Sequence, residues 1–380
     1  MKVEPFAMER FQSVWEHQVR LNLSESGVHP LSVRELVGDG AALDAVLDQP
    51  LIYTQTNGTE ALRTAIAALY PGATAAHVEV TNGGAEANFL AAWYLVQPGD
   101  EVVMLVPTYM QTHGLVRAFG GVVREWPLVE DPAARRWRLD LDRLAALVGP
   151  TTRAIVLCAP NNPTGLRLTA ADFDAIAAVA DRHGCWIVSD EIYRGAERDG
   201  VASPTMWGRA ERVLVTSGLS KAYGLPGLRV GWVMATPEVA EALWSYHDYT
   251  TIAPGAISDR LAQVALAPAT RARLLARTRR VVAENLAAVE RWLEARADRF
   301  SFFPADAGAF AYTRYRAPIN STALVTRLRE EESVLIVPGD QFGMDGYLRL
   351  GVGERTDYVL EGLDRLEALL ARLPDAAAAR

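Results

Sequence analysis

The feature that most constrains the fold is a regular alternation of short apolar segments and amphipathic segments through the middle of the chain. The apolar segments are rich in β-branched residues, and we predict strands at 77–80, 101–106, 153–159, 185–189, 212–217 and 230–235. Between two of them, residues 169–183 read as a helix: Thr169 can cap it, Phe173 and Ile176 share one face, and Gly184 ends it. Strands that alternate with helices indicate a mostly parallel sheet covered by helices on both faces.

After about residue 267 the pattern changes to that of a smaller α+β domain. We predict helices at 271–297, 322–331 and 357–373 and strands at 301–303, 309–313, 335–337 and 347–352. An amphipathic stretch with Phe11 and Trp15 near the N-terminus is expected to pack on this domain. The predicted organisation is an N-terminal segment (1–45), a large domain (46–268) and a small C-terminal domain (269–380).

Composition excludes several classes of protein. The net charge of −8 is spread along the chain and argues against a general affinity for nucleic acid or anionic membranes. The sequence has no apolar stretch long enough for a membrane span and no signal-peptide pattern, and Cys158 and Cys185 lie in apolar runs, so we expect a cytoplasmic protein. The six histidines are scattered, so no metal site is expected, and the absence of a G-x-G-x-x-G turn argues against a nicotinamide dehydrogenase.

The segment TSGLSKAYGLPGLRVGW (216–232) contains the first candidate for chemistry, Lys221. A lysine that forms a Schiff base must be held rigidly and be deprotonated part of the time, which burial near another cation favours. Arg229, eight residues on, offers a bidentate fork for a dianionic phosphate, and Ser220 adds a hydroxyl donor. On its own, the segment is also explained as a surface loop with a solvated lysine.

Two further segments follow predicted strands directly: SDEIY (189–193) and APNNPTG (159–165). Ligands of open α/β sheets bind at the carboxyl ends of the parallel strands. Asp190 is suited to pair with a protonated ring nitrogen, and Tyr193 and Asn162 to hydrogen-bond to a phenolate oxygen of the same ring. Taken singly, these segments are also explained by a helix-terminal acid beside a packing tyrosine and by a tight turn.

Two more segments complete the set. In TNGGAEAN (81–88), Gly83 and Gly84 let the backbone approach a phosphate, and the N–H groups of Gly84 and Ala85 start a predicted helix. In GYLRLGVG (346–353), Arg349 lies among apolar neighbours and needs an anionic partner. A substrate carboxylate and a structural salt bridge both meet that need.

With these residues in view, the chain resembles the class I/II aminotransferases, the fold type I pyridoxal-phosphate enzymes, from about residue 53 to residue 352. The family pattern YxxxxGxxxLRxAIA is present as YTQTNGTEALRTAIA (53–67). At about family spacing there follow TNGGAEA, PTY (107–109), NPTG, DEIY, SK with its arginine, and PGDQFG (338–343). The resemblance implies a seven-stranded, mostly parallel sheet flanked by helices, together with a smaller α+β domain.

The resemblance also implies pyridoxal 5′-phosphate as cofactor and a homodimer that transfers the amino group of an L-amino acid to a 2-oxo acid. Lys221 would form the internal aldimine and carry the proton between the substrate α-carbon and the cofactor, with Asp190 and Tyr193 as the other catalytic residues. The implied cofactor contacts are Asp190 to the pyridinium, Asn162 and Tyr193 to the phenolate oxygen, Tyr109 to the ring face, and Gly84, Ala85, Ser220, Arg229 and the partner subunit's Tyr53 to the phosphate. The implied substrate contacts are Arg349 to the α-carboxylate, with Gly27, Asn162 and Glu25 nearby.

The chain departs from the family pattern in three places. Gly218 stands where the family has a serine three residues before the lysine, and the adjacent Ser217 would point elsewhere in an extended strand. The substrate-side loop NLSESGVHPL (22–31) adds Glu25 and His29, and His113 follows the PTY motif.

The SESGVH loop, LSKAYGLPGLR and DYTTIAPGAISDRLA (248–262) resemble the capreomycidine synthase-like branch. In that branch, a guanidine-bearing amino acid bound to the cofactor undergoes elimination and ring closure instead of transamination. Glu25 would then pair with a guanidinium, although it is equally explained as a solvated loop charge. The sequence leaves both reactions open.

Overall fold

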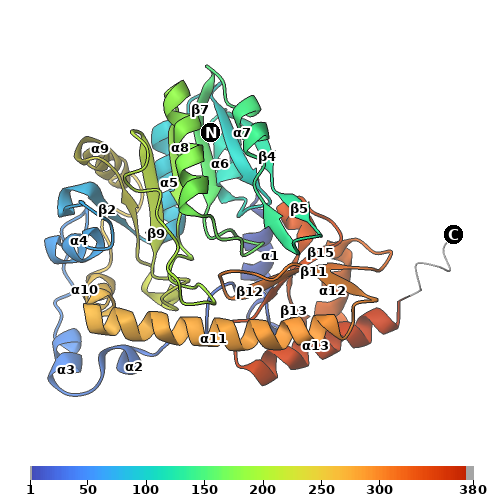
Figure 1. Ribbon diagram of the computed structural model, residues 1–380. Helices are drawn as coiled ribbons and strands as arrows, with labels where there is room; N and C mark the ends of the chain where they lie inside the picture. The colour runs from blue at the N-terminus through green and yellow to red at the C-terminus, as the bar shows by residue number, and fades with distance from the viewer. Residues whose placement is uncertain (1, 374–380) are drawn as a thin grey trace.

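The computed structural model describes residues 2–373. A large sheet flanked by helices lies above the long helix α11 (Pro268–Glu294), and a smaller sheet packs over the other end of that helix (Figure 1). Among the described residues, no helix is long and apolar enough to cross a membrane.

The large sheet has seven strands. In spatial order they are β2 (Val78–Thr81), β10 (Gly231–Met234), β9 (Val213–Gly218), β8 (Trp186–Asp190), β7 (Thr152–Cys158), β3 (Glu101–Val106) and β4 (Val122–Pro127). Only β10 runs antiparallel to its neighbours. The predicted fold class and all six predicted strands are confirmed, each within one residue at its ends. Strand β4 was missed because Arg124 and Glu125 interrupt its apolar pattern.

Alternate residues of each strand face two different helical layers, as the two-residue period requires. Val102 and Met104 of β3 pack towards α5 (Gly84–Leu95), α6 (Gln111–Ala118) and α9 (Pro237–His247). Val103 and Leu105 belong to the other core, which the remaining helices of this domain cover: α4 (Glu60–Ala67), α7 (Leu141–Leu147), α8 (Ala170–His183) and α10 (Ala256–Leu266).

The helix predicted at 169–183 is confirmed as α8. Thr169 accepts a hydrogen bond from the Asp172 N–H, and the Asp172 side chain accepts one in return from the Thr169 N–H, which forms a capping box. Gly184 ends the helix in the left-handed conformation with φ 65°.

The smaller sheet is antiparallel, with β11 (Phe300–Phe302), β12 (Phe310–Tyr315), β15 (Tyr347–Gly351) and β14 (Val337–Pro338) in order. Helices α12 (Ser321–Glu332) and α13 (Thr356–Ala371) complete this core. The single strand predicted at 335–337 was wrong: β13 (Val334–Leu335) pairs with β1 (Leu21–Asn22), and β14 pairs with β15. The chain changes sheets at Ile336, a buried apolar residue that continues the apolar run.

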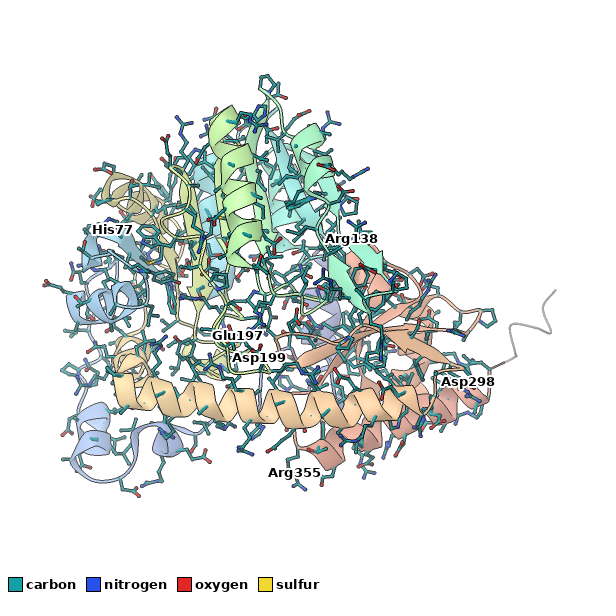
Figure 2. All side chains as sticks on the ribbon, in the orientation of Figure 1. His77, Arg138, Glu197, Asp199, Asp298 and Arg355 are labelled. Carbon is teal, nitrogen blue, oxygen red and sulfur yellow. The ribbon has the colours of Figure 1, made fainter. Side chains whose placement is uncertain are left out.

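Helix α11 joins the two cores. Leu274 and Leu275 pack in the large core, whereas Leu286 and Val289 pack in the small one. Above the helix, Figure 2 labels Glu197, whose buried carboxylate accepts from the Arg279 guanidinium of α11 at 3.0 Å. This ion pair fixes the helix against the loop that follows β8.

The N-terminal helix α1 (Ala7–Trp15) also touches both cores. Phe11 packs against the small core, and the Arg329 guanidinium lies 3.8 Å from the centre of the Trp15 ring. Met8 belongs to the large core. The division of the chain at residues 45 and 268 stays a prediction.

The remaining elements are short. They are α2 (Val33–Val37), α3 (Ala41–Leu47), the hairpin β5 (Val129–Asp131) and β6 (Arg136–Arg138), and three short 3₁₀ turns at Ala75–His77, Pro226–Leu228 and Gly339–Phe342.

Candidate active site

A cavity of about 300 Å³ lies at the carboxyl ends of β7 and β8, between the large sheet, the small domain and α1. This volume is at the lower end of the range for small-molecule sites. Most of the predicted site residues line it: Glu25, Gly84, Ala85, Tyr109, Asn162, Asp190, Tyr193, Ser220, Lys221, Arg229 and Arg349. Tyr53 and Gly27 do not.

At the inner end of the cavity, Asp190 is held by two hydrogen bonds. Its carboxylate accepts from the Asn88 side-chain amide at 3.0 Å and from the Ile192 backbone N–H at 3.1 Å. Burial raises the pKa of Asp190, so its negative charge needs a cation facing it from the cavity.

Asn88 is a site residue that the sequence reasoning missed. Its amide also accepts from the Thr216 hydroxyl at 2.7 Å, so its orientation towards Asp190 is set by the neighbouring strand β9. Asn88 lies four residues after Gly84 in α5 and therefore on the same helical face. The four-residue spacing from Gly84 is therefore the sequence feature that indicates a position for Asn88 at the site.

At the opposite end, the turn before α5 and Arg229 form an anion cradle. Gly83 has φ +91°, and a Cβ there would lie 2.3 Å from Arg229 Nη2, so the guanidinium rests directly on this turn. The first N–H groups of α5 have no partner within the helix, and the helix dipole favours an anion there. The Ser220 hydroxyl lies 3.4 Å from the same guanidinium.

Ser217 does not replace the missing serine at position 218. Its hydroxyl donates to the Glu191 carbonyl at 3.3 Å and lines a separate small cavity. A Cβ at Gly218 would lie 2.8 Å from the Val230 carbonyl oxygen, so this backbone leaves no room for a side chain there. The anion cradle therefore has one hydroxyl donor fewer than the family pattern.

Lys221 lines the same cavity, and its side chain is partly exposed. The sequence has only two lysines, and the other, Lys2, is exposed near the N-terminus. Lys221 Nζ lies 3.5 Å from the Glu25 carboxylate and lowers the pKa of that acid against the opposing effect of burial.

Arg349 is buried to 1% exposure although no carboxylate among the described residues pairs with it. Its guanidinium donates to the Asn162 side-chain oxygen at 3.0 Å and to the Ser24 carbonyl at 2.6 Å, while Nε has no partner. A structural salt bridge is therefore not what holds Arg349. A buried guanidinium with an unpartnered donor, on a residue that lines a cavity, is suited to an incoming carboxylate.

Tyr193 and Tyr109 are buried or half-buried on the cavity wall. The Tyr193 hydroxyl donates to Ser26 at 2.8 Å, and burial raises its pKa strongly. The Tyr109 hydroxyl donates to the Glu9 carboxylate at 2.8 Å, and the Phe6 ring packs edge-on against it at 5.0 Å. These contacts bring α1 to the cavity.

Helix α1 was expected to pack on the small domain, but its part in the site was missed. Met8, Glu9, Gln12, Ser13 and Glu16 line the cavity. Their local pattern indicates only an amphipathic helix, and their place at the site depends on where that helix docks.

Two predicted contacts are not seen in this cavity. Tyr53 is 80% exposed, as a residue that serves a neighbouring subunit must be, and that role stays a prediction. Gly27 lines an adjoining cavity of about 60 Å³, and a Cβ there would lie 3.2 Å from the Ser220 carbonyl oxygen. Its close packing keeps the loop against Lys221, and the expected contact with a substrate stays a prediction.

The two histidines noted in the sequence take structural positions. His29 Nδ1 lies 3.0 Å from the Gly353 carbonyl oxygen. His113 Nε2 lies 3.7 Å from the Glu125 carboxylate, outside the cavity.

The donor set of the cavity fits pyridoxal 5′-phosphate. The glycine turn and Arg229 match a phosphate, Asp190 matches a ring nitrogen that carries a proton, and Lys221 supplies the amine. The free Nε of Arg349 remains for a carboxylate of the substrate. Within residues 2–373, no cluster of His, Cys, Asp or Glu is arranged to hold a metal ion.

Comparison with known proteins gives a family match and close structural likenesses. Residues 42–366 match the family described as aminotransferase class I and II. Capreomycidine synthase from Streptomyces vinaceus is 33% identical over 88% of this chain and 85% of its own length. A PLP-dependent aminotransferase from Streptococcus suis superposes with a TM-score of 0.90 at 30% identity, covering 99% of this chain and 100% of that one. The PLP-dependent cyclase OrfR superposes with a TM-score of 0.87 at 29% identity, covering 98% of each chain.

Proposed function

Because the chain belongs to the class I and II aminotransferases, which are pyridoxal-phosphate-dependent enzymes, we propose that Lys221 carries the cofactor and that the cavity around it performs amino transfer. The donor is an L-amino acid and the acceptor a 2-oxo acid. The observation that supports this proposal best is that Lys221, Asp190, Arg229 and Arg349 come from separate segments and line one cavity.

The phosphate and ring of the cofactor would be held from both ends of the cavity. Arg229, Ser220 and the N–H groups at the start of α5 bind the phosphate. Asp190, fixed by Asn88, would hold the protonated ring nitrogen, and the bound cofactor would supply an acceptor for negative charge from the substrate α-carbon.

The substrate is oriented by Arg349, whose buried guanidinium binds the α-carboxylate. The Lys221 amine would remove the proton from the substrate α-carbon and hold it for its return. Tyr193 and Asn162 would hydrogen-bond to the phenolate oxygen, and Tyr109 would cover the ring face.

The two lysines allow a direct test of the attachment residue. The purified protein is expected to absorb in the visible range, and Lys221→Ala to lose that band, while the control Lys2→Ala keeps it. Borohydride reduction followed by peptide mapping should place the added mass on Lys221. An unchanged spectrum in Lys221→Ala would remove the assignment.

Elimination with ring closure remains a second candidate. It is favoured by the 33% identity to capreomycidine synthase, the likeness to the cyclase OrfR, and the position of Glu25 beside Lys221 at 3.5 Å. Incubation with single amino acids in the absence of an oxo acid separates the two reactions. Amino transfer leaves the aminated cofactor, whereas cyclisation gives a ring product and leaves the cofactor in its aldehyde form.

The proposed assembly is a cytoplasmic homodimer in which Tyr53 serves the site of the partner subunit. Exposed apolar side chains gather along two segments, Leu47, Leu51, Ile52 and Tyr53 on one and Tyr249 and Ile252 on the other. The segments are joined by a hydrogen bond from the Thr54 hydroxyl to the Pro254 carbonyl at 3.2 Å. Asn82 ties the second segment to the phosphate turn through Thr251 at 2.6 Å, so this apolar surface adjoins the anion cradle.

Subunit complementation tests this arrangement. Lys221→Ala and Tyr53→Ala are each expected to be weakly active or inactive, but hybrid dimers contain one intact site when Tyr53 acts across the interface. An equal mixture refolded together should regain about a quarter of the wild-type activity. No recovery would place Tyr53 within its own subunit or outside the site.

A further inference from the structure

The cavity wall opposite the sheet is acidic. Glu9 belongs to helix α1, and Glu16 is the residue that directly follows this helix. Glu25 comes from the loop after β1. Glu9 accepts a hydrogen bond from Tyr109, which leaves its charge uncompensated. The nearest partner of Glu16 is His17 at 3.4 Å, whose side chain is almost fully exposed.

The three carboxylates also influence one another. Burial raises the pKa of Glu16, and the charges of Glu25 and Glu9 raise it further. A wall of this kind repels added negative charge and gains from a nearby cation.

Acidic residues outnumber basic residues in the cavity. Four carboxylates and three cations line it. In the proposed function, Arg229 binds phosphate, Arg349 binds the substrate α-carboxylate, Lys221 either holds the cofactor or acts as a neutral base, and Asp190 faces the ring nitrogen. No protein cation of the cavity then remains for the three glutamates of the wall.

We propose that the substrate is an amino acid whose side chain ends in a cation, an ammonium or a guanidinium, and that Glu9, Glu16 and Glu25 recognise it. This inference rests on the proposed function, since Arg349 must take the α-carboxylate. Arg349 gives an independent anchor for the ligand: it is 1% exposed, and its Nε is unpartnered. The substrate thus meets a cation for its α-carboxylate and carboxylates for its side chain.

The three glutamates have different parts in this recognition. Glu25 is 3.5 Å from Lys221 and pairs with that amine until the cofactor engages it, so its charge becomes available to the substrate only in the loaded enzyme. Glu9 and Glu16 form no ion pair with Lys221, so their substitution tests specificity while leaving the contact between Glu25 and Lys221 in place. A charge-assisted contact to a cationic side chain is expected to favour binding roughly tenfold to hundredfold over a neutral isostere.

Isosteric amino-acid pairs provide the test. L-arginine is compared with L-citrulline, and L-lysine with L-norleucine, by titrating the holoenzyme and following the cofactor spectrum for the dissociation constant, with kcat/KM measured separately. At least one cationic member is expected to bind roughly tenfold or more tightly than its neutral isostere, and the responding pair identifies guanidinium or ammonium. Glu9→Gln and Glu16→Gln should reduce this ratio, whereas the control Glu241→Gln, an exposed residue of α9, should preserve it.

The failures of the two proposals are distinguishable. If the neutral isosteres bind as tightly as the cationic ones while the aminated cofactor still forms, this inference is wrong and the proposed function stands. If no amino acid changes the spectrum or the cofactor form, both this inference and the proposed function are wrong. A preference that survives in Glu9→Gln and in Glu16→Gln would show that α1 does not recognise the side chain.

Discussion

Replacing His247 by glutamine is expected to destabilise the large domain in a pH-dependent manner. His247 ends α9 and has 0% exposure. Its Nδ1 lies 2.8 Å from the buried Glu79 carboxylate, and its Nε2 lies 3.4 Å from Glu86 and 3.0 Å from the Thr251 hydroxyl. Glutamine retains a hydrogen-bonding group of similar length but carries no charge.

The size of the effect follows from the protonation of His247. Burial lowers its pKa, but the hydrogen bonds to Glu79 and Glu86 outweigh this and raise the pKa to about 9. Glu86 is ionised at pH 7 and serves as the counter-ion of His247, because its hydrogen bonds outweigh burial and lower its pKa to about 2. With an unfolded pKa near 6.5 and about 1.4 kcal/mol per unit, the charged form contributes about 2–3 kcal/mol at pH 7.

The stabilising contribution of His247 is lost as the pH rises, whereas that of most ion-paired carboxylates is lost as the pH falls. A raised pKa stabilises the folded state below the unfolded value, and the contribution is lost as the pH rises through about 9. The difference in unfolding free energy between wild type and His247→Gln should therefore shrink by about 2–3 kcal/mol between pH 7 and pH 10.

Urea unfolding followed by circular dichroism at both pH values measures this difference. His183→Gln, at the exposed end of α8, is a matched control and should change stability little at either pH. A difference for His247→Gln that is equal at pH 7 and pH 10 would refute the reasoning. Because Glu86 also accepts from the Asn82 N–H at 2.6 Å, the variant should bind the cofactor more weakly too.

Three further predictions concern the cavity. Asp190→Asn should retain the cofactor but lower kcat roughly a hundredfold or more, since the ring nitrogen loses its counter-ion; near-normal turnover in steady-state assays would mean that Asp190 is only structural. Arg349→Lys should raise the KM for the amino donor roughly tenfold or more, because an ammonium cannot replace the buried fork, and an unchanged KM would contradict that role. Gly83→Ala should weaken cofactor binding at least about tenfold in equilibrium dialysis, because its Cβ would meet Arg229 at 2.3 Å. Gly72→Ala, with φ +72° and nothing within 4 Å, controls for backbone strain, and equal losses in both glycine variants would count against the cradle.

Local pattern was enough to predict most of the fold. The strand at 101–106 matches β3 at both ends, because a buried strand needs a continuous apolar run. The helix after Thr169 was readable from its cap and from Gly184, since both act on the backbone within a few residues. The convergence of Asp190 and Asn162 was also readable, because parallel strands bring their carboxyl ends to one edge.

Tertiary structure decided which distant segments share the cavity. The periodicity of α1 shows which face is apolar but not which surface covers it, so Glu9 and Glu16 gave no local sign of lining the site. Local pattern also gives no sign of the change of sheet at Ile336. The apolar run there is divided because the residues before Ile336 pair with β1 and those after it pair with β15. Sequence determines what each segment needs to bury or pair with, and only the folded chain determines which segment meets that need, because long-range contacts leave no periodic trace in the residues that make them.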